Sequence, residues 1–362
     1  MCIACETKLS PESLDEFGGR FLNILNHGAL AVMISIGHRT GLFAAMRQTG
    51  PATSHQLAAE AGLDERYVRE WLGAMTCGEI ASCDETGSVF TLVPAAAEML
   101  GGGNGQESLA YLAQYVGMMG FVEDKVIDCF HRGGGVPYSA FPRFHEVMAC
   151  DSKQTVVDPL LDHILPLVPG ISLAMHNGID VLDIGCGRGK ALLKMAAQFP
   201  RSRFTGWDLS EEATRAAGNE ANALGLRNVK FEVRDLSDFH ETAPAAAFGF
   251  ITAFDAIHDQ ARPDHVLAGI RKALKEDGIF LMQDIGASSN VAENTGHAIG
   301  TLLYSLSCTH CMTVSLAQGG LGVGAMWGEQ LTREFLANAG FHQVERRTLP
   351  HDIQNYYYIV KP

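Results

Sequence analysis

The sequence predicts an α/β fold in its C-terminal half, preceded by a mainly helical region. From Ile179 onward, short apolar runs of strand length alternate with segments of helical periodicity. Such alternation is typical of a parallel sheet that is covered by helices on both faces. A glycine-rich turn follows the first of these runs, at residues 185–189. The N-terminal half instead shows apolar residues at helical spacing.

The strands and helices expected in the C-terminal half follow one another in a regular order. The apolar runs predict strands at 181–184, 204–207, 229–233, 248–254 and 279–284. Helical spacing predicts helices at 189–199, 211–224 and 263–275. Two late strands are expected over 340–347 and 356–360, with a loop between them.

The first part of the chain is expected to form a long apolar helix over residues 13–47. The apolar positions at helical spacing begin with Phe17, Phe21, Leu22 and Leu25. This segment is more apolar than a surface helix needs, and it fits either a core helix or a dimer interface. The longest apolar stretch, Ala29–Gly37, is too short to span a bilayer, so we expect no membrane partner.

Residues 53–92 show the order helix, turn, helix, hairpin that is typical of a winged helix. Thr53 or Ser54 is expected to cap the first helix, and Asp64 the second. Many winged helices bind DNA. Here the second helix carries two acids beside its two arginines, which is poor for phosphate contact: Glu65, Arg66, Arg69 and Glu70. We therefore expect dimerisation or support of a substrate lid rather than DNA binding.

Residues 93–170 are expected to be mainly helical, with glycine-rich breaks at 101–105 and 133–137. The second break leads into an aromatic segment from Tyr138 to His145. This segment fits a wall of a substrate pocket or a packed connector.

The composition excludes several classes of protein. Hydrophobic residues make up 47% of the 362 residues, which indicates a globular protein. The formal net charge of −14 repels phosphates, so we expect no nucleic-acid partner. The N-terminus lacks a basic segment followed by an apolar run, and nine cysteines in a chain of this length do not form a disulfide scaffold. A reducing cytoplasm is the expected location.

The most specific motif is the run Asp180-Val-Leu-Asp-Ile-Gly-Cys-Gly-Arg-Gly189. Its glycines, Gly185, Gly187 and Gly189, permit positive φ and a close approach of a ligand to the backbone. In dinucleotide-binding folds such a turn holds a pyrophosphate. Here Asp183 lies inside the end of the strand, where a carboxylate repels phosphate and attracts a cation. A ligand with an ammonium and a sulfonium group fits this turn better.

Acidic residues follow the next strands at the same edge of the expected sheet. Asp208 ends the second strand, where it can accept hydrogen bonds from two ribose hydroxyls. Asp235 follows the third strand, where it can meet an adenine amino group, and Phe254-Asp255 ends the fourth. Open α/β sheets bind ligands at the carboxyl ends of their strands.

These residues resemble those of class I S-adenosylmethionine-dependent methyltransferases, over about residues 178–362. The resemblance implies a Rossmann-like seven-stranded sheet with a terminal antiparallel strand and S-adenosyl-L-methionine as cofactor. It matches Asp183, Gly185 and Gly187 to the loop at the methionine side, Asp208 to the ribose and Asp235 to the adenine. The expected cofactor-binding residues are Asp183, Gly185, Cys186, Gly187, Asp208, Leu209, Asp235, Leu236, Phe254 and Asp255.

Together with the winged helix, the whole chain resembles the mycobacterial-type two-domain small-molecule methyltransferases. This resemblance implies a homodimer formed through the N-terminal part. We expect a helical and winged-helix dimerisation domain at 1–100, a helical connector and substrate-lid region at 101–177, and a class I methyltransferase domain at 178–362.

The leading candidate for a general base is His258, which follows Asp255 at the mouth of the expected pocket. A hydroxyl acceptor needs a base, whereas a thiolate does not. Asp259 is expected to orient the histidine. The alternative is a histidine that caps the following helix.

A second candidate region lies between the fifth strand and the last pair. Cys308, His310 and Cys311, with Cys2 and Cys5, offer soft metal ligands, but they lack a zinc-finger context. We assign no metal and expect a pocket wall of small, polarisable side chains. The expected substrate residues are Tyr138, His145, His297, Tyr304, Cys308, His310, Cys311 and Trp327.

The function expected from these features is methylation of a small molecule at an oxygen, sulfur or nitrogen atom. One alternative is methylation of a thiol specifically. A second is a ligand-sensing transcriptional regulator that binds DNA through its winged helix. A third is an NAD-dependent oxidoreductase, which Asp183 and the spacing of the glycines disfavour.

Overall fold

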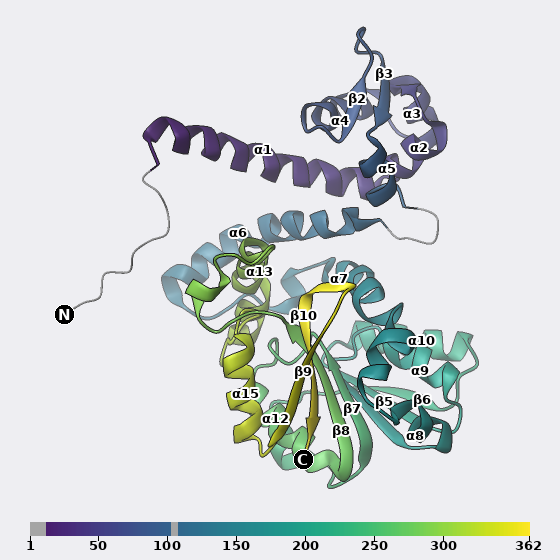
Figure 1. Ribbon diagram of the computed structural model, residues 1–362, viewed down its shortest axis with the longest axis vertical. Coiled ribbons are helices and arrows are strands. Elements are labelled where there is room, and N and C mark those ends of the chain that lie inside the picture. Colours follow the sequence, from purple (N-terminus) through teal and green to yellow (C-terminus); the bar gives the residue numbers. More distant parts are fainter. Residues whose placement is uncertain (1–11, 103–107) are drawn as a thin grey trace, which may run out of the picture. The chain divides into compact units, whose positions relative to one another are not determined.

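A computed structural model describes residues 12–102 and 108–362 of the chain (Figure 1). The chain divides into two compact units, residues 1–117 and residues 118–362. The connector expected over 101–177 is therefore shared between the two units.

The described part of the N-terminal unit is a winged helix that follows a long first helix, as predicted. Its three strands pair in the order β1-β3-β2. The expected helix over 13–47 is interrupted at Gly41, which adopts φ +75°. The elements are α1 (Leu14–Arg39), α2 (Leu42–Thr49), β1 (Ala52–Thr53), α3 (Ser54–Ala61), α4 (Glu65–Cys77), β2 (Ala81–Cys83), β3 (Val89–Leu92), α5 (Pro94–Met99) and η1 (Leu109–Ala113).

Local sequence signals begin the helices of this unit. Thr53 and Gln56 form a capping box at α3, and the Asp64 side chain accepts a hydrogen bond from the Arg66 N–H at the start of α4. The core is formed around Trp71, which is 2% exposed and donates its indole N–H to the carbonyl of Met33 at 2.8 Å. The winged helix therefore packs directly on the C-terminal half of α1.

The N-terminal half of α1 leaves its apolar side chains exposed. Phe17 and Phe21 are each 48% exposed, and Leu25 is 54% exposed. By length and composition alone, α1 is apolar enough to cross a membrane. We did not predict this from the sequence, because we considered only the longest uninterrupted apolar stretch. Within its first two turns it carries Asp15, Glu16 and Arg20.

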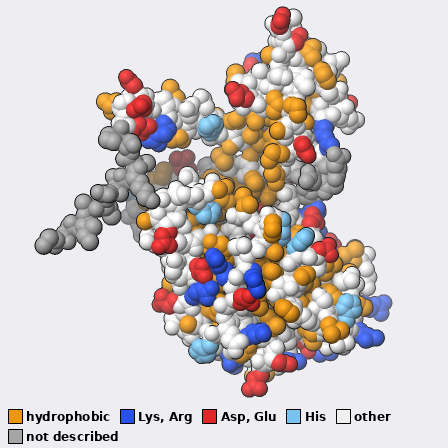
Figure 2. All heavy atoms as spheres, viewed as in Figure 1, with side chains coloured by type: hydrophobic (Ala, Val, Ile, Leu, Met, Phe, Trp, Pro, Cys, Tyr) orange, Lys and Arg blue, Asp and Glu red, His pale blue; other side chains and the backbone are white. Residues whose placement is uncertain are grey.

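The second helix of the winged helix, α4, is electrostatically balanced. Arg66 pairs with Glu70, and Arg69 pairs with Glu65 at 2.9 Å. On the face shown in Figure 2, Lys and Arg side chains are interspersed with Asp and Glu and form no continuous basic surface. The four charged side chains of α4 that the sequence singled out are therefore paired with one another.

In the C-terminal unit, seven described strands form one sheet in the order β6-β5-β4-β7-β8-β10-β9. β10 pairs antiparallel with both of its neighbours, β8 and β9, whereas the pairs among β4, β5, β6, β7 and β8 are parallel; a terminal antiparallel strand was expected. The strands are β4 (Asp180–Ile184), β5 (Arg203–Asp208), β6 (Val229–Val233), β7 (Phe248–Phe254), β8 (Leu274–Ile285), β9 (Gln343–Leu349) and β10 (Asp352–Lys361). A two-residue turn, not a longer loop, joins the last two strands.

Helices cover both faces of this sheet, because alternate residues of each strand point to opposite sides. On β7, Ile251 packs into the core under α12 and α15, whereas Phe250 packs into the core under α8 and α9. The helices are α8 (Ile171–Asn177), α9 (Lys190–Gln198), α10 (Glu211–Ala223), α11 (Phe239–Thr242), α12 (Pro263–Ala273) and α15 (Gly328–Asn338).

Two segments lie beyond the carboxyl edge of the sheet, except that the end of the first, residues 156–168, packs into the core under α8 and α9. They pack on each other through a cluster that includes Val122, Phe141 and Val314, and the backbone N–H of Val136 donates to Thr313 Oγ1 at 2.8 Å. The first comprises α6 (Gln114–Arg132), η2 (Tyr138–Ala140), α7 (Phe144–Ser152), η3 (Lys153–Val157), η4 (Leu160–Ile164) and η5 (Leu165–Leu167). The second comprises η6 (Val291–Asn294), α13 (Gly300–Leu306), η7 (Ser307–Cys311) and α14 (Met312–Ala317).

Candidate functional site

A cavity of about 720 Å³ lies at the carboxyl ends of β4, β5 and β7 and beside the loop that follows β6. All ten residues expected to bind a cofactor line it: Asp183, Gly185, Cys186, Gly187, Asp208, Leu209, Asp235, Leu236, Phe254 and Asp255. Their role remains a proposal, but the fold brings them together around one space.

The glycine-rich turn after β4 forms one wall of this cavity. Gly185, Gly187 and Gly189 have φ of +66°, +51° and +67°, the left-handed conformation that glycine adopts most readily. A Cβ atom on Gly185 would lie 2.4 Å from the Cβ of Ala256. The motif therefore needs glycine both for its backbone conformation and for close packing.

Asp183 is buried at the base of the cavity, where it is 3% exposed. Its Oδ1 accepts a hydrogen bond from the Thr252 hydroxyl at 2.7 Å. Burial raises the pKa of Asp183 to about 7, and the nearby Asp208 carboxylate acts in the same direction. A cation in the cavity would stabilise the ionised form of this side chain.

Asp208 and Asp235 occupy the ends of neighbouring strands. Asp208 accepts hydrogen bonds from the backbone N–H groups of Gly187 and Ser210, each at 2.8 Å. Asp235 accepts from the backbone N–H of Ser237 at 2.9 Å. Because a carboxylate has about four lone-pair sites, both side chains keep acceptor capacity for a ligand.

The basic residues at the cavity already have partners. Arg188 pairs with Glu212 at 2.9 Å, and Lys190 pairs with Glu220 at 2.7 Å. The guanidinium of Arg234 lies 4.0 Å from the centre of the Trp207 ring. The charge that faces the cavity is therefore set largely by carboxylates. These hydrogen-bond acceptors suit a cationic nucleoside better than a phosphorylated one.

Beside the cavity, His258 is the centre of a buried acidic cluster. Its Nδ1 lies 2.7 Å from Asp284 Oδ1, which also accepts the indole N–H of Trp327 at 3.1 Å. Asp255, which has φ +52°, places Oδ1 3.8 Å from the same nitrogen. Burial alone would lower the pKa of His258, but the carboxylates of Asp284 and Asp259 raise it well above its usual value.

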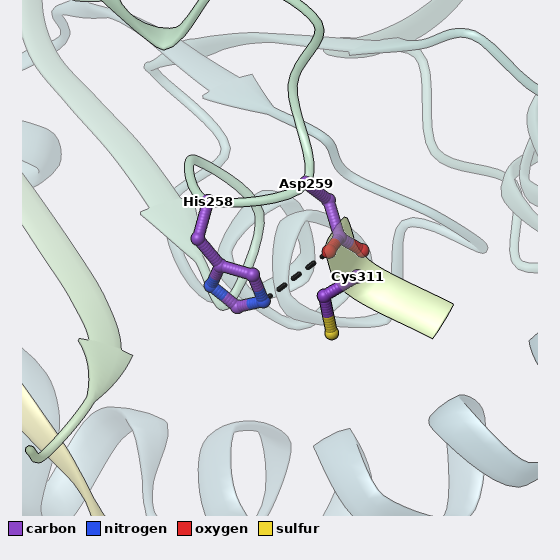
Figure 3. A group of neighbouring side chains, drawn as sticks. All are labelled: His258, Asp259 and Cys311. Atoms are coloured by element: carbon purple, nitrogen blue, oxygen red, sulfur yellow. Dashed lines mark ion pairs between the residues drawn. The ribbon is translucent and has the colours of Figure 1, made fainter. Parts of the chain in front are cut away.

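The second ring nitrogen of His258 faces a different pair of residues. Its Nε2 lies 3.3 Å from Asp259 Oδ1, and Cys311 lies beside both (Figure 3). Burial raises the pKa of the Cys311 thiol to about 12. Asp259 lines the cavity, whereas His258, at 2% exposure, lies behind the lining.

An aromatic wall closes the same side of the cavity. Tyr138, Phe141 and Phe144 line it, and Phe144 stacks on His310 with ring centroids 3.8 Å apart. Burial lowers the pKa of His310 to about 4, which keeps the ring neutral. The Tyr138 hydroxyl donates to Asp259 Oδ2 at 3.2 Å, so this wall is joined to the His258 cluster.

Only some of the residues expected to contact a substrate line the cavity. Tyr138 and His145 line the cavity. The others lie behind the lining: His310 in the aromatic wall, Cys311 beside His258 and Trp327 on Asp284. His297, Tyr304 and Cys308 lie farther from it, with His297 Nε2 3.0 Å from the Gly286 carbonyl, the Tyr304 hydroxyl accepting from Asn294 at 2.9 Å, and Cys308 packed against apolar residues near Val314.

The ligand set considered from the sequence, Cys308, His310 and Cys311, does not gather around one point. Cys311 instead groups with His258 and Asp259. Cys2 and Cys5 lie outside the described residues.

The sequence alone did not lead us to two residues of the site, Phe144 and Asp284. Phe144 belongs to the aromatic segment from Tyr138 to His145. Asp284 ends an expected strand, as the other acids do, and this signal was available in the sequence.

The fold and the site define the class of this protein: a winged-helix unit followed by a class I methyltransferase fold. Comparison with protein families identifies the two domains more closely. Residues 28–101 match the Rv2258c-like winged HTH domain, and residues 175–350 match a methyltransferase domain.

Solved structures share both units of the fold. A putative O-methyltransferase from Nostoc punctiforme is 18% identical, with a TM-score of 0.71 over 97% of this chain and 100% of that one. Human N-acetylserotonin methyltransferase, solved with SAM, is 16% identical, with a TM-score of 0.63 over 98% of this chain and 99% of that one.

Sequence relatives are matched over shorter segments. Nocamycin O-methyltransferase of Saccharothrix syringae is 38% identical over 77 residues, which are 21% of this chain and 27% of the relative. Two other relatives are matched over 17% and 56% of their lengths. The chain thus spans about half or less of these relatives.

Proposed function

We propose that this protein transfers the methyl group of S-adenosyl-L-methionine to a small-molecule acceptor. One observation carries the proposal: ten residues expected from the sequence to bind this cofactor line a single cavity at the carboxyl edge of the sheet. The methyltransferase domain at 175–350 and the fold shared with a SAM-bound enzyme support it.

The residues of the cavity fit this cofactor in their chemistry. Asp208 would accept hydrogen bonds from the ribose hydroxyls, and Asp235 would meet the adenine amino group, with Leu209 packing on the base. Asp183 would face the positively charged methionine end. When bound, the cofactor supplies an electrophilic methyl carbon beside a sulfonium.

The acceptor would lie against the aromatic wall of Tyr138, Phe141 and Phe144. Such a wall favours a flat or apolar small molecule, because aromatic rings bury much apolar area. The enclosed cavity would position the acceptor atom for in-line attack, which supplies much of the rate of a methyl transfer. The acceptor atom stays open among oxygen, sulfur and nitrogen.

His258 and Asp259 would act on the proton that an acceptor hydroxyl or thiol must lose. Because the neighbouring carboxylates raise the pKa of His258, its ring would first release a proton to solvent before Nε2 could serve as the base. Asp284 holds His258 Nδ1 and so directs Nε2 toward Asp259, the member of this pair that lines the cavity. Asp284 is thus a positioning residue for the base, a part that we had expected Asp259 to play.

We further propose that the protein is cytoplasmic and forms a homodimer. The exposed apolar side chains of α1, among them Phe17, Phe21 and Leu25, support an interface between two copies. The paired charges of α4 disfavour the alternative of a DNA-binding regulator.

Turnover tests the proposal. Purified protein is incubated with methyl-labelled S-adenosylmethionine and a panel of phenols, thiols and amines, and the demethylated cofactor is quantified. We expect acceptor-dependent product from at least one class, reduced by Asp208→Ala. Acceptor-independent background alone, with cofactor bound, would contradict catalysis and favour a sensor.

A further inference from the structure

Three side chains that commonly bind transition metals meet beside the cavity. One donor atom of each, His258 Nε2, an Asp259 carboxylate oxygen and Cys311 Sγ, lies within 4.8 Å of the other two. Figure 3 shows His258 and Asp259 on the loop after β7, joined by an ion pair, and Cys311 beside them on a helical segment. The sequence separation between the two sources is more than fifty residues, so the fold alone brings them together.

The Asp259 carboxylate has one oxygen without a hydrogen bond. Its Oδ2 accepts from the Tyr138 hydroxyl at 3.2 Å. Its Oδ1 is buried, accepts no hydrogen bond within the described part of the chain and lies 3.3 Å from His258 Nε2. The protonated imidazole compensates the charge of this oxygen, and a metal ion bound to both side chains would take the place of that proton.

The imidazole of His258 is held as a metal-binding histidine usually is. Its Nδ1 faces Asp284 Oδ1 at 2.7 Å, and Asp284 is fixed in turn by the backbone N–H of Ile285 at 2.8 Å. The arrangement of carboxylate, histidine and metal fixes the ring orientation and leaves Nε2 for the ion. His258 Nε2 therefore faces the space between Asp259 and Cys311.

The backbone at Cys311 is also unusual. The segment η7, Ser307–Cys311, is a π-helix between α13 and α14, and the Met312 N–H donates to the Ser307 carbonyl. π-Helical turns are rare and occur frequently at functional sites, because they change which side chains face inward. Here the turn places Cys311 beside His258, whereas Cys308 packs against apolar residues.

The donor set selects the kind of ion. A thiolate with an imidazole favours a borderline-soft divalent ion over calcium or magnesium, and zinc accepts a carboxylate as well. Zinc binds such donors at about 2.0–2.3 Å in a tetrahedron. Three protein ligands leave one position, which in catalytic zinc sites holds water or substrate.

We propose that His258 Nε2, Asp259 Oδ1 and Cys311 Sγ form a site for Zn²⁺. The Cys311 thiol and the protonated Nε2 of His258 each give a proton to solvent as the sulfur–zinc and nitrogen–zinc bonds form. An ion here would lower the pKa of an acceptor hydroxyl or thiol bound in its fourth position, and it would take the place of a free histidine base. This consequence rests on the proposed function, but binding of the ion does not.

Metal binding to the full-length protein tests the site directly. The protein is stripped with a chelator and titrated with Zn²⁺ in competition with a chromophoric chelator, and then with Co²⁺ while the absorption spectrum is recorded. We expect one Zn²⁺ per chain and, with Co²⁺, a thiolate-to-cobalt charge-transfer band. The matched variants are Cys311→Ser and Cys308→Ser, because both cysteines lie on η7.

The variants separate this site from adventitious binding. Cys311→Ser is expected to abolish the charge-transfer band, and Cys308→Ser to leave it unchanged. Asp284 is the hydrogen-bond partner of the proposed ligand His258. Asp284→Asn leaves the three ligands in place and is expected to weaken Zn²⁺ binding by about 10–100-fold. Folding is checked by thermal melting of each variant.

The proposal is overturned if the stripped protein takes up no Zn²⁺ in the competition, or if folded Cys311→Ser binds Co²⁺ with the same spectrum as the unmodified protein. Binding of S-adenosylhomocysteine is measured on the same samples. Its loss would count against the proposed function and leave the metal site to be judged by the spectra.

Discussion

The backbone N–H of Gly187 donates a hydrogen bond to the Asp208 carboxylate at 2.8 Å, across 21 residues of sequence. This bond ties the glycine-rich turn after β4 to the end of β5. The two parts of the proposed cofactor site, the loop and the ribose acceptor, are therefore held in register by one side chain. A change at Asp208 acts on both.

Asp208→Ala is expected to weaken cofactor binding by about 1–3 kcal/mol, because a charge-assisted acceptor of the ribose hydroxyls is lost. Calorimetry with S-adenosylhomocysteine measures the change. Asp238→Ala is the control, since this aspartate follows β6 outside the cavity lining. Equal affinity of the Asp208 variant and the unmodified protein would remove Asp208 from the site.

Asp183 is expected to make the stability of the ligand-free protein depend on pH. Its carboxyl holds a proton up to about pH 7 in the folded state, whereas the pKa of an unperturbed aspartate is 3.8. The folded state binds more protons within this window, so this group's contribution to stability falls as pH rises from about 4 to 7. Thermal melts of Asp183→Asn should lack this component and show higher stability than the unmodified protein at pH 8.

The same group is expected to couple cofactor binding to proton release. A cation beside Asp183 favours its ionised form, so binding near pH 6 should release a proton from this carboxyl. Calorimetry in buffers of different ionisation enthalpy measures the number of protons. Asp183→Asn should bind the cofactor more weakly, and it should lose this release. An unchanged release in the variant would assign the proton to another group.

Gly185→Ala is expected to destabilise the protein and to abolish cofactor binding. The new Cβ would meet Ala256 at 2.4 Å, at a residue with φ +66°. Strain and overpacking of this kind cost about 1–3 kcal/mol each. Gly187→Ala is the matched control, because it has φ +51° but its Cβ would meet no described atom within 4 Å. Chemical denaturation should rank Gly185→Ala below Gly187→Ala in stability.

His258→Ala is expected to reduce turnover by about 10²–10⁴-fold with cofactor affinity retained, because His258 lies behind the lining of the cavity. His176→Ala, at an exposed position of α8, is the control. Steady-state kinetics and calorimetry separate the two effects. Undiminished turnover would exclude His258 from acid–base chemistry and from the binding of a catalytic ion alike.

Replacement of Phe17 and Phe21 by glutamate is expected to dissociate the proposed dimer, because both rings are half exposed and face the same side of α1. Sedimentation equilibrium measures the dissociation constant. Tyr67→Glu is the control, an exposed aromatic residue on α4 at 80% exposure. A monomeric unmodified protein would contradict the proposal of a homodimer.

Much of the proposed cofactor site was predictable because the positions of its residues depend on local order. Asp183, Asp208 and Asp255 lie at the ends of strands that apolar runs predict, and parallel strands bring their carboxyl ends to one edge. The turn needs glycine for positive φ, which the spacing of Gly185, Gly187 and Gly189 already indicates.

The surroundings of His258 were harder to predict because they depend on packing between distant segments. Asp284 reaches His258 because β8 lies next to β7, an order that strand patterns alone do not give. Cys308 and Cys311 are close in sequence, but the π-helix η7 sends them to different neighbours. The neighbours of Cys311 are therefore decided by how η7 folds and not by the spacing of the two cysteines in the sequence.

We propose that carboxylates at the strand ends bind a cationic nucleoside. Competition binding by calorimetry tests this, with S-adenosylhomocysteine and S-adenosylmethionine measured against NAD and flavin nucleotides on the same protein. We expect one site per chain for the adenosyl-sulfur compounds, weakened by Asp208→Ala, and no binding of the phosphorylated nucleotides at the same site. Tight binding of NAD or a flavin nucleotide, with neither S-adenosyl compound retained, would contradict it.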